Sequence, residues 1–165
     1  MLLSSVSRRL TRCARTWVVS AAVASIVAFG APGIAGAQVA VVVHPSNTTE
    51  ELSLDNLRRL FLGQAKTFPN GAHARLAVHG PSAENFDRAA LGLQPQVVRS
   101  RWMAIVFRGE AMSIPTELPA ADEVKKFVRD HPDAIAYLPL SQVDATVKVL
   151  SIAGHKPNDA AYVIR

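Results

Sequence analysis

The residues best suited to binding chemistry lie in one short stretch, where an apolar strand leads through a turn into a helix. Leu76–Val78 reads as a buried strand, and Pro81 ends it because proline has no N–H to donate to a sheet. Ser82 is a candidate N-cap, since its hydroxyl can accept a backbone N–H from the first helical turn. The unpaired N–H groups that head a helix favour an anion, so we expect a small oxyanion to bind there. The candidate ligand-binding residues are His79, Gly80, Ser82 and Ala83. The simpler alternative is that Ser82 only caps the helix.

Other side chains give no pattern typical of catalysis. The five histidines are scattered, and none shows the H-E-x-x-H spacing of a zinc enzyme. His73 and His79 could share one face of a strand, but two ligands do not make a zinc site. Ser82 also lacks the G-x-S-x-G turn of a hydrolase nucleophile. The sequence therefore predicts a protein that is not an enzyme, with no metal and no cofactor.

Residues 1–37 have the pattern of an export signal. Four arginines without an acidic residue precede the apolar run Trp17–Phe29, and small residues follow at Ala35–Ala37. We expect cleavage after Ala37 and a periplasmic protein that is not inserted in the membrane. The alternative is an uncleaved anchor, because Trp17–Ala37 is just long enough to span a bilayer.

Removal of this segment changes what charge and cysteine content imply. The whole chain has 18 basic and 13 acidic residues, a formal net charge of +5. Without residues 1–37, 14 basic and 13 acidic residues remain, a net charge of +1. A near-neutral domain is a poor candidate for nonspecific nucleic-acid binding. The single cysteine, Cys13, leaves with the signal, so no disulfide is expected. Residues 38–165 suffice for one ordinary domain.

Five segments are predicted to be extended. Val39–Val43 is a β-branched run that suits a strand covered on both faces. Leu76–Val78 and Ala134–Leu138 are shorter apolar strands, the second stopped by a proline. Val147–Ile152 is predicted as a further strand and Tyr162–Arg165 as a last edge strand. A short extended piece is also predicted within the loop from Gly109 to Pro119, at Met112–Ile114.

Helices are predicted between these strands. Ser53 caps a helix whose apolar residues recur every three or four positions, and Gly63 ends it. A second helix runs from Ser82 to Gly92. The other two begin at Pro95, with Trp102 on its apolar stripe, and at Ala120. The alternation predicts an α/β fold with a central mixed sheet of four to five strands flanked by helices.

Four segments, in order, resemble the phosphate-binding proteins of ABC transporters. Leu52–Gly63 and then Phe68–Gly71 resemble the family's L-x-x-x-x-L-x-x-I-F-x-G and W-x-D-G segments. The strand, turn and helix through Ser82 lie where the family has its R-x-D-G-S-G-T anion loop. Asp130–Leu138 resembles x-x-P-G-A-I-G-Y-V, and Gly154–Tyr162 is similar to G-x-x-P-x-x-x-x-Y.

The resemblance implies one lobe of a type 2 periplasmic binding protein, a fold in which two α/β lobes enclose the ligand. The chain has the length of one lobe. Ser82 matches the family's serine, but the threonine and the arginine are missing, and His79 stands nearest the arginine position. Glu84 adds a carboxylate to the loop. Phosphate carries about −1.5 charges near neutrality, so a half-site of this kind would bind it with only millimolar affinity, roughly −4 kcal/mol.

Two functions remain open at the level of sequence. The first is an exported, periplasmic solute-binding-type domain, a substrate-binding protein that recognises phosphate or a similar oxyanion. The second is a degenerate lobe that acts as a protein-interaction module for an envelope transporter or sensor. The sequence specifies neither the partner nor the oligomeric state.

Overall fold

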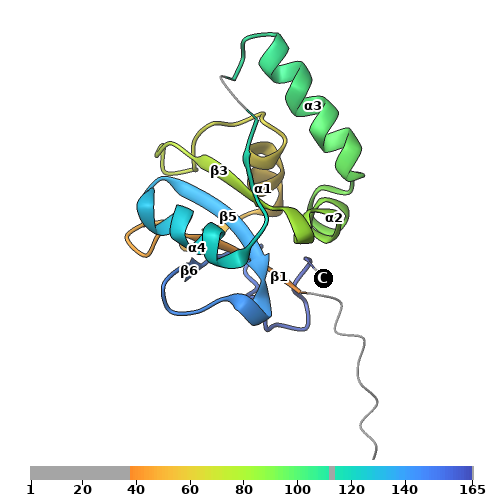
Figure 1. The fold of residues 1–165 in the computed structure, drawn as a ribbon. Helices are drawn as coiled ribbons and strands as arrows, with labels where there is room; N and C mark the ends of the chain where they lie inside the picture. The colour runs from red at the N-terminus through yellow and green to blue at the C-terminus, as the bar shows by residue number, and fades with distance from the viewer. Residues whose placement is uncertain (1–37, 112–113, 165) are drawn as a thin grey trace, which may run out of the picture. The chain divides into compact units, whose positions relative to one another are not determined.

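The computed structural model of the chain describes residues 38–111 and 114–164, so the predicted export signal lies outside the described residues. These residues form a five-stranded mixed sheet with the strand order β4-β3-β5-β1-β6 (Figure 1). The five strands are β1 (Val39–Val43), β3 (Arg75–His79), β4 (Thr116–Leu118), β5 (Ala134–Pro139) and β6 (Lys148–Val149). Two further short strands, β2 (Glu51–Leu52) and β7 (Ser151–Ile152), pair with each other in parallel. The predicted fold class is confirmed.

Strands β1 and β5 form the centre of the sheet. Every residue of β1 is buried, as its unbroken β-branched sequence predicts for a strand covered on both faces. β1 runs antiparallel to β5, with Val41 opposite Tyr137, and antiparallel to β6. β3 runs parallel to both β5 and β4. The sheet is therefore mixed: its parallel part consists of β4, β3 and β5, and its antiparallel part of β5, β1 and β6.

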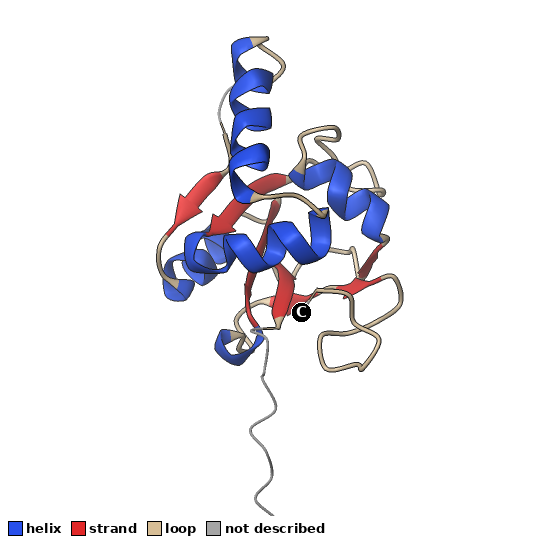
Figure 2. Cartoon of the chain, turned by 90° about the vertical axis from the view of Figure 1, so that its right-hand side faces the viewer, coloured by secondary structure: helices blue, strands red, loops and turns tan. Residues whose placement is uncertain are grey.

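Alternating side chains divide the core between the two faces of the sheet. On one face Val39, Val41 and Val43 belong to a cluster that includes α1 and the helix after β3. On the other face Val42 packs with residues of α4 (Ala121–Asp130). Figure 2 shows helices on either side of the strands.

Local capping explains where α1 (Leu54–Phe61) begins and ends. The backbone N–H of Asn56 donates to the Ser53 hydroxyl at 3.1 Å, which confirms the predicted N-cap. Gly63 follows with a φ of +70°, a conformation that glycine adopts readily. A Cβ at Gly63 would lie 2.6 Å from Cδ1 of Ile105, so the end of α1 is packed tightly against α3 (Pro95–Phe107).

The segment after β3 is helical throughout, but it is not one regular helix. A 3-10 turn (η1, Gly80–Ser82) leads into α2 (Ala83–Phe86), which continues as a π-helical segment (η2, Asp87–Leu91). Gly92 ends it with a φ of +70°. Chain entry through the 3-10 turn places Ser82 at φ −99° and ψ −2°, not in the extended conformation of an N-cap. The expected cap by Ser82 is wrong for this reason.

Three expected strands differ from the structure. The segment 147–152 is divided between two sheets, with Leu150 between β6 and β7 and its N–H donating to Val41 at 2.9 Å. Within the described part of Tyr162–Arg165 there is no strand, although the Ile164 carbonyl accepts a hydrogen bond from Val39 at 3.3 Å. The strand expected at Met112–Ile114 lies instead at Thr116–Leu118, and residues 112–113 are outside the described range.

Among the described residues, none of the helices has the length and apolar character needed to cross a membrane.

Candidate functional site

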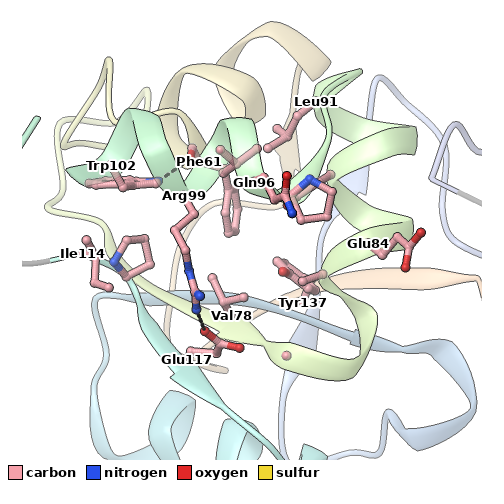
Figure 3. A pocket seen from close by; sticks show the side chains of 16 residues that line it. Phe61, Val78, Glu84, Leu91, Gln96, Arg99, Trp102, Ile114, Glu117 and Tyr137 are labelled. Carbon is pink, nitrogen blue, oxygen red and sulfur yellow. Dashed lines mark hydrogen bonds and ion pairs between the residues drawn. The ribbon is translucent and has the colours of Figure 1, made fainter. Parts of the chain in front are cut away.

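A cavity of about 390 Å³ lies between α3, the helical segment after β3, and the β3–β4 edge of the sheet (Figure 3). Its wall is largely apolar, as is usual for small-molecule sites of this size. The apolar lining comes from Phe61, Val78, Leu91, Pro95, Val98, Trp102, Ile114 and Pro115. The polar or backbone-exposing lining comes from Gly80, Ala83, Glu84, Asp87, Gln96, Arg99, Glu117 and Tyr137.

Aromatic contacts hold one side of the cavity rigidly. Tyr137 stacks on Phe86 with ring centroids 3.9 Å apart and an interplanar angle of 10°. Phe61 meets the Phe86 ring edge-on at 4.8 Å. On α3, the Trp102 indole N–H donates to the Phe61 carbonyl at 2.9 Å. Because Trp102 is both buried in the core and part of the cavity wall, a ligand there would change the surroundings of its indole ring.

Asp87 is the charged residue of the cavity wall whose side chain has no partner among the described residues. It is 7% exposed, and within the described residues its carboxylate has neither a hydrogen bond nor an ion pair. Burial raises the pKa of Asp87 to about 6. Removal of an ionised carboxylate from water without a partner costs free energy, which is why Asp87 keeps its proton to a higher pH than an exposed aspartate.

Tyr137 is a second polar residue of the cavity wall. It is 1% exposed, and no hydrogen bond of its hydroxyl is found among the described residues. Burial, and then the charges of Asp87 and Glu117, raise the pKa of Tyr137 above its ordinary value. The phenol therefore stays protonated at neutral pH and can donate a hydrogen bond to a ligand.

The other charged groups of the wall are already paired. Glu84 pairs with Arg88 one turn later at 2.8 Å, and Figure 3 shows its carboxylate directed away from the other labelled side chains. Arg99 reaches from α3 to Glu117 on β4 at 2.9 Å, which the same view marks with a dashed line. Asp87 is consequently the one wall charge, among the described residues, without a counter-charge.

The structure divides the four residues expected to bind a ligand between two sides of the sheet. Gly80 and Ala83 line the 390 Å³ cavity. His79 lies two residues after Ala77 on β3, so it faces the same side of the sheet, where Ala77 packs with α4. There His79 borders a second hollow of about 660 Å³. Ser82 lines neither space, because it is 5% exposed and its hydroxyl is hydrogen-bonded to His79 Nδ1 at 2.8 Å.

This arrangement bears on anion binding. Burial lowers the pKa of His79, so its imidazole carries no charge at neutral pH. The Ser82 hydroxyl is engaged, and Arg99, the one cation among the cavity-lining residues, is paired with Glu117. An oxyanion at Gly80 and Ala83 would meet backbone groups together with three carboxylates. Such a site offers too few donors to replace the water around a divalent anion.

Sequence reasoning missed Asp87 and Tyr137. A signal for Asp87 was present, because it lies on the stripe of Ala83, Ala90 and Leu91, spaced by three and four residues along an apolar helix face. A carboxylate on such a stripe is buried on folding, and that is unusual for aspartate. Trp102, expected to be a core residue, is buried at 7% exposure and also lines the cavity.

No group of three or more histidine, cysteine or acidic side chains within residues 38–111 and 114–164 could hold a metal ion.

Solved structures with a similar fold are phosphate-binding proteins. One is assigned as a phosphate ABC transporter substrate-binding protein, with bound phosphate, from Clostridium perfringens: TM-score 0.57, 16% identity, covering 73% of this chain and 46% of that one. PstS from Borrelia burgdorferi aligns with a TM-score of 0.58 and 13% sequence identity, and the alignment covers 77% of this chain and 53% of PstS. An ABC-type phosphate transport receptor from Vibrio cholerae aligns with a TM-score of 0.50 and 14% sequence identity, and the alignment covers 73% of this chain and 48% of the receptor. No protein-family profile and no curated protein sequence matches the chain.

These likenesses show a shared fold, that of about half of each binding protein. The chain spans 46–53% of the three solved chains, which fits the expectation of a relative with a single lobe. The five-stranded mixed sheet flanked by helices is the fold that the sequence predicts.

Proposed function

We propose that the chain is an exported, periplasmic solute-binding-type domain that binds a small ligand in the 390 Å³ cavity beside Asp87. The observation that carries this proposal is a mainly apolar cavity that contains two buried polar groups, Asp87 and Tyr137, without partners in the described residues. Polar side chains that border an apolar cavity of this size and have no protein partner are available to hydrogen-bond a ligand. The fold shared with binding proteins supports the same conclusion.

The proposal is binding without chemistry. The described residues that line the cavity include no serine, cysteine or histidine that could act as a nucleophile. Export is supported by the arginine-rich and apolar pattern of residues 1–37.

Phosphate or a similar oxyanion is the ligand that the fold relatives favour, because the Clostridium perfringens protein holds phosphate. The proposed contacts are the four residues of the turn, His79, Gly80, Ser82 and Ala83, of which Gly80 and Ala83 line the cavity. The wall chemistry opposes tight binding, because Glu84, Asp87 and Glu117 all line the same cavity. We therefore expect phosphate affinity no better than millimolar, roughly −4 kcal/mol.

Isothermal titration of the full chain tests the oxyanion ligand. Phosphate is titrated at neutral pH into the wild type and into Ser82→Ala. Heat at millimolar phosphate that is lost in Ser82→Ala would support the oxyanion site at this turn. No heat in either protein would remove phosphate as the ligand and leave the cavity proposal to be tested with other solutes.

A second candidate function is protein interaction. Its supporting observation is the pair Met103 and Phe107, one turn apart on α3, which are 43% and 82% exposed and border one shallow hollow. Capture of envelope proteins on the immobilised chain, compared with Phe107→Ser, would test it. A partner retained by the wild type and lost by Phe107→Ser supports this function, and equal capture by both argues against this surface.

A further inference from the structure

We propose that the cavity takes a small organic cation, an amine with an apolar body, whose ammonium group donates hydrogen bonds to the Asp87 carboxylate. This inference rests on the proposed function, because it names the class of solute that the same cavity binds.

The charge pairing in the wall selects a cation. Glu84 and Glu117 have their own arginines at 2.8 Å and 2.9 Å, whereas Asp87 is unpaired in the described part of the chain. Asp87 as a residue is 7% exposed, so solvent screens its charge less than at the surface and a cationic partner gains more there. A ligand ammonium would supply the missing counter-charge and donor together.

The rest of the wall selects an apolar body. Phe61, Leu91, Val98 and Trp102 surround the space with hydrocarbon and aromatic surface. The Tyr137 ring, fixed by its stack on Phe86, lies in the same wall and offers its edge, its face or its hydroxyl to a bound amine. A cavity of about 390 Å³ holds a ligand of one ring with a short side chain.

Other ligand classes fit the wall less well. A metal ion needs several anionic or imidazole ligands, and no such group of three exists among the residues described. An anion would find no unpaired cation in the described wall, because Arg99 is already paired with Glu117.

Three probes of nearly equal size separate the classes: benzylamine is cationic, benzyl alcohol is neutral and benzoate is anionic. Each is titrated at neutral pH into the full chain carrying Trp17→Phe, so that Trp102 in the cavity wall is the one tryptophan left. We expect benzylamine to shift Trp102 fluorescence at millimolar concentration and to bind roughly tenfold or more tightly than benzyl alcohol. Benzoate should bind more weakly than either.

Asp87→Asn keeps the shape of the side chain and removes its charge. In this variant the preference for benzylamine over benzyl alcohol should fall to within about threefold. The matched control is Glu50→Gln, which removes an exposed carboxylate outside the cavity lining, 3.9 Å from Lys148 Nζ. It should keep the preference of the wild type.

The two proposals fail in different ways. If benzyl alcohol or benzoate shifts Trp102 as strongly as benzylamine, or if Asp87→Asn keeps the preference, the cation is wrong while the cavity remains a ligand site. If none of the three probes, nor phosphate, changes Trp102 fluorescence or gives heat, both the cation and the solute-binding function are contradicted.

Discussion

At the scale of single residues, Asp87 is the group on which the account depends. A carboxylate that is buried, lacks a partner and has a pKa of about 6 destabilises the folded chain at neutral pH. Its ordinary pKa is 3.8. Between these two values the folded chain holds a proton at Asp87 that the unfolded chain has lost, so the stability contributed by this proton is lost as pH rises through that window.

The first prediction concerns Asp87→Asn. Because the charge is removed, the variant should be more stable than the wild type at pH 7.5 by roughly 1–3 kcal/mol, the free energy of a pKa shift of one to two units. The difference should shrink as the pH falls through the window from about 6 to 3.8 and vanish well below 3.8, where Asp87 is neutral in both states. Urea unfolding of both proteins across this pH range measures it, and Glu84→Gln serves as the control for a paired carboxylate. A less stable Asp87→Asn at pH 7.5 would show that the carboxylate has a partner.

The second prediction concerns the buried pair of His79 and Ser82. Ser82→Ala removes the hydroxyl 2.8 Å from His79 Nδ1 and leaves a buried nitrogen without a partner. We expect a loss of about 1–3 kcal/mol in the free energy of unfolding. Benzylamine binding should not change, since Ser82 does not line the cavity. Loss of benzylamine binding at full thermal stability would instead make Ser82 a ligand contact.

At the scale of elements, the site depends on how firmly α3 is held beside the sheet. α3 contacts the end of α1 through Trp102 and Ile105, the two α3 side chains that a Cβ at Gly63 would meet. The hydrogen bond from the Trp102 indole to Phe61 fixes the same junction at 2.9 Å. The packing of α3 against α1 therefore depends on a glycine that lies outside the cavity lining.

The third prediction compares two glycines of equal φ. Gly63→Ala introduces a Cβ 2.6 Å from Ile105 Cδ1, whereas Gly92→Ala meets nothing within 4 Å, and both residues have φ of +70°. Gly92→Ala should lower the free energy of unfolding by about 1 kcal/mol, from backbone strain alone. Gly63→Ala should lose a further 1–3 kcal/mol, roughly, because the junction is overpacked. Thermal unfolding of the two variants measures the difference, and equal losses would show that the junction is loosely packed.

The sequence predicted the elements whose pattern is local. Val39–Val43 is mostly β-branched and forms a strand inside the sheet, and the Ser53 cap and Gly63 end of α1 follow from residue type alone. Leu150 separates β6 from β7 by bonding to Val41, a contact that depends on the position of β1, so the expected strand from Val147 to Ile152 could not be divided from sequence.

The site was predicted less completely than the fold. Gly80 and Ala83 do line a cavity, but the parity of β3 turns His79 to the other face, and Ser82 is engaged with it. Whether Asp87 finds a partner is decided by side chains from α3, β4 and β5, which no local pattern reveals. The ligand assignment of the four residues remains a prediction.

At the scale of the whole molecule, the chain has the fold of about half of a phosphate-binding protein, and its cavity is formed within that half. The wall that binds the proposed solute comes from α1, α3, the helical segment after β3, and strands β3 to β5.

The fourth prediction concerns export. If residues 1–37 are a cleaved signal, the protein recovered from the periplasm of an expressing bacterium should begin at Gln38. Intact-mass measurement checks this, with Ala35→Leu and Ala37→Leu as variants that should block cleavage because large side chains disfavour the signal peptidase site. Retention of Met1–Ala37 in the exported wild type would instead indicate an anchor.

The most direct test of the central claim is the pKa of Asp87 itself, measured from its carboxyl ¹³C chemical shift as a function of pH, without and with benzylamine. We expect the pKa of Asp87 to be about 6 in the free chain. We also expect a fall of about one unit or more when benzylamine binds, because a cation beside the carboxylate favours its charged form. A pKa near 3.8 in the free chain, or a raised pKa that benzylamine leaves unchanged, would contradict the claim that this carboxylate is held unpaired for a cationic ligand.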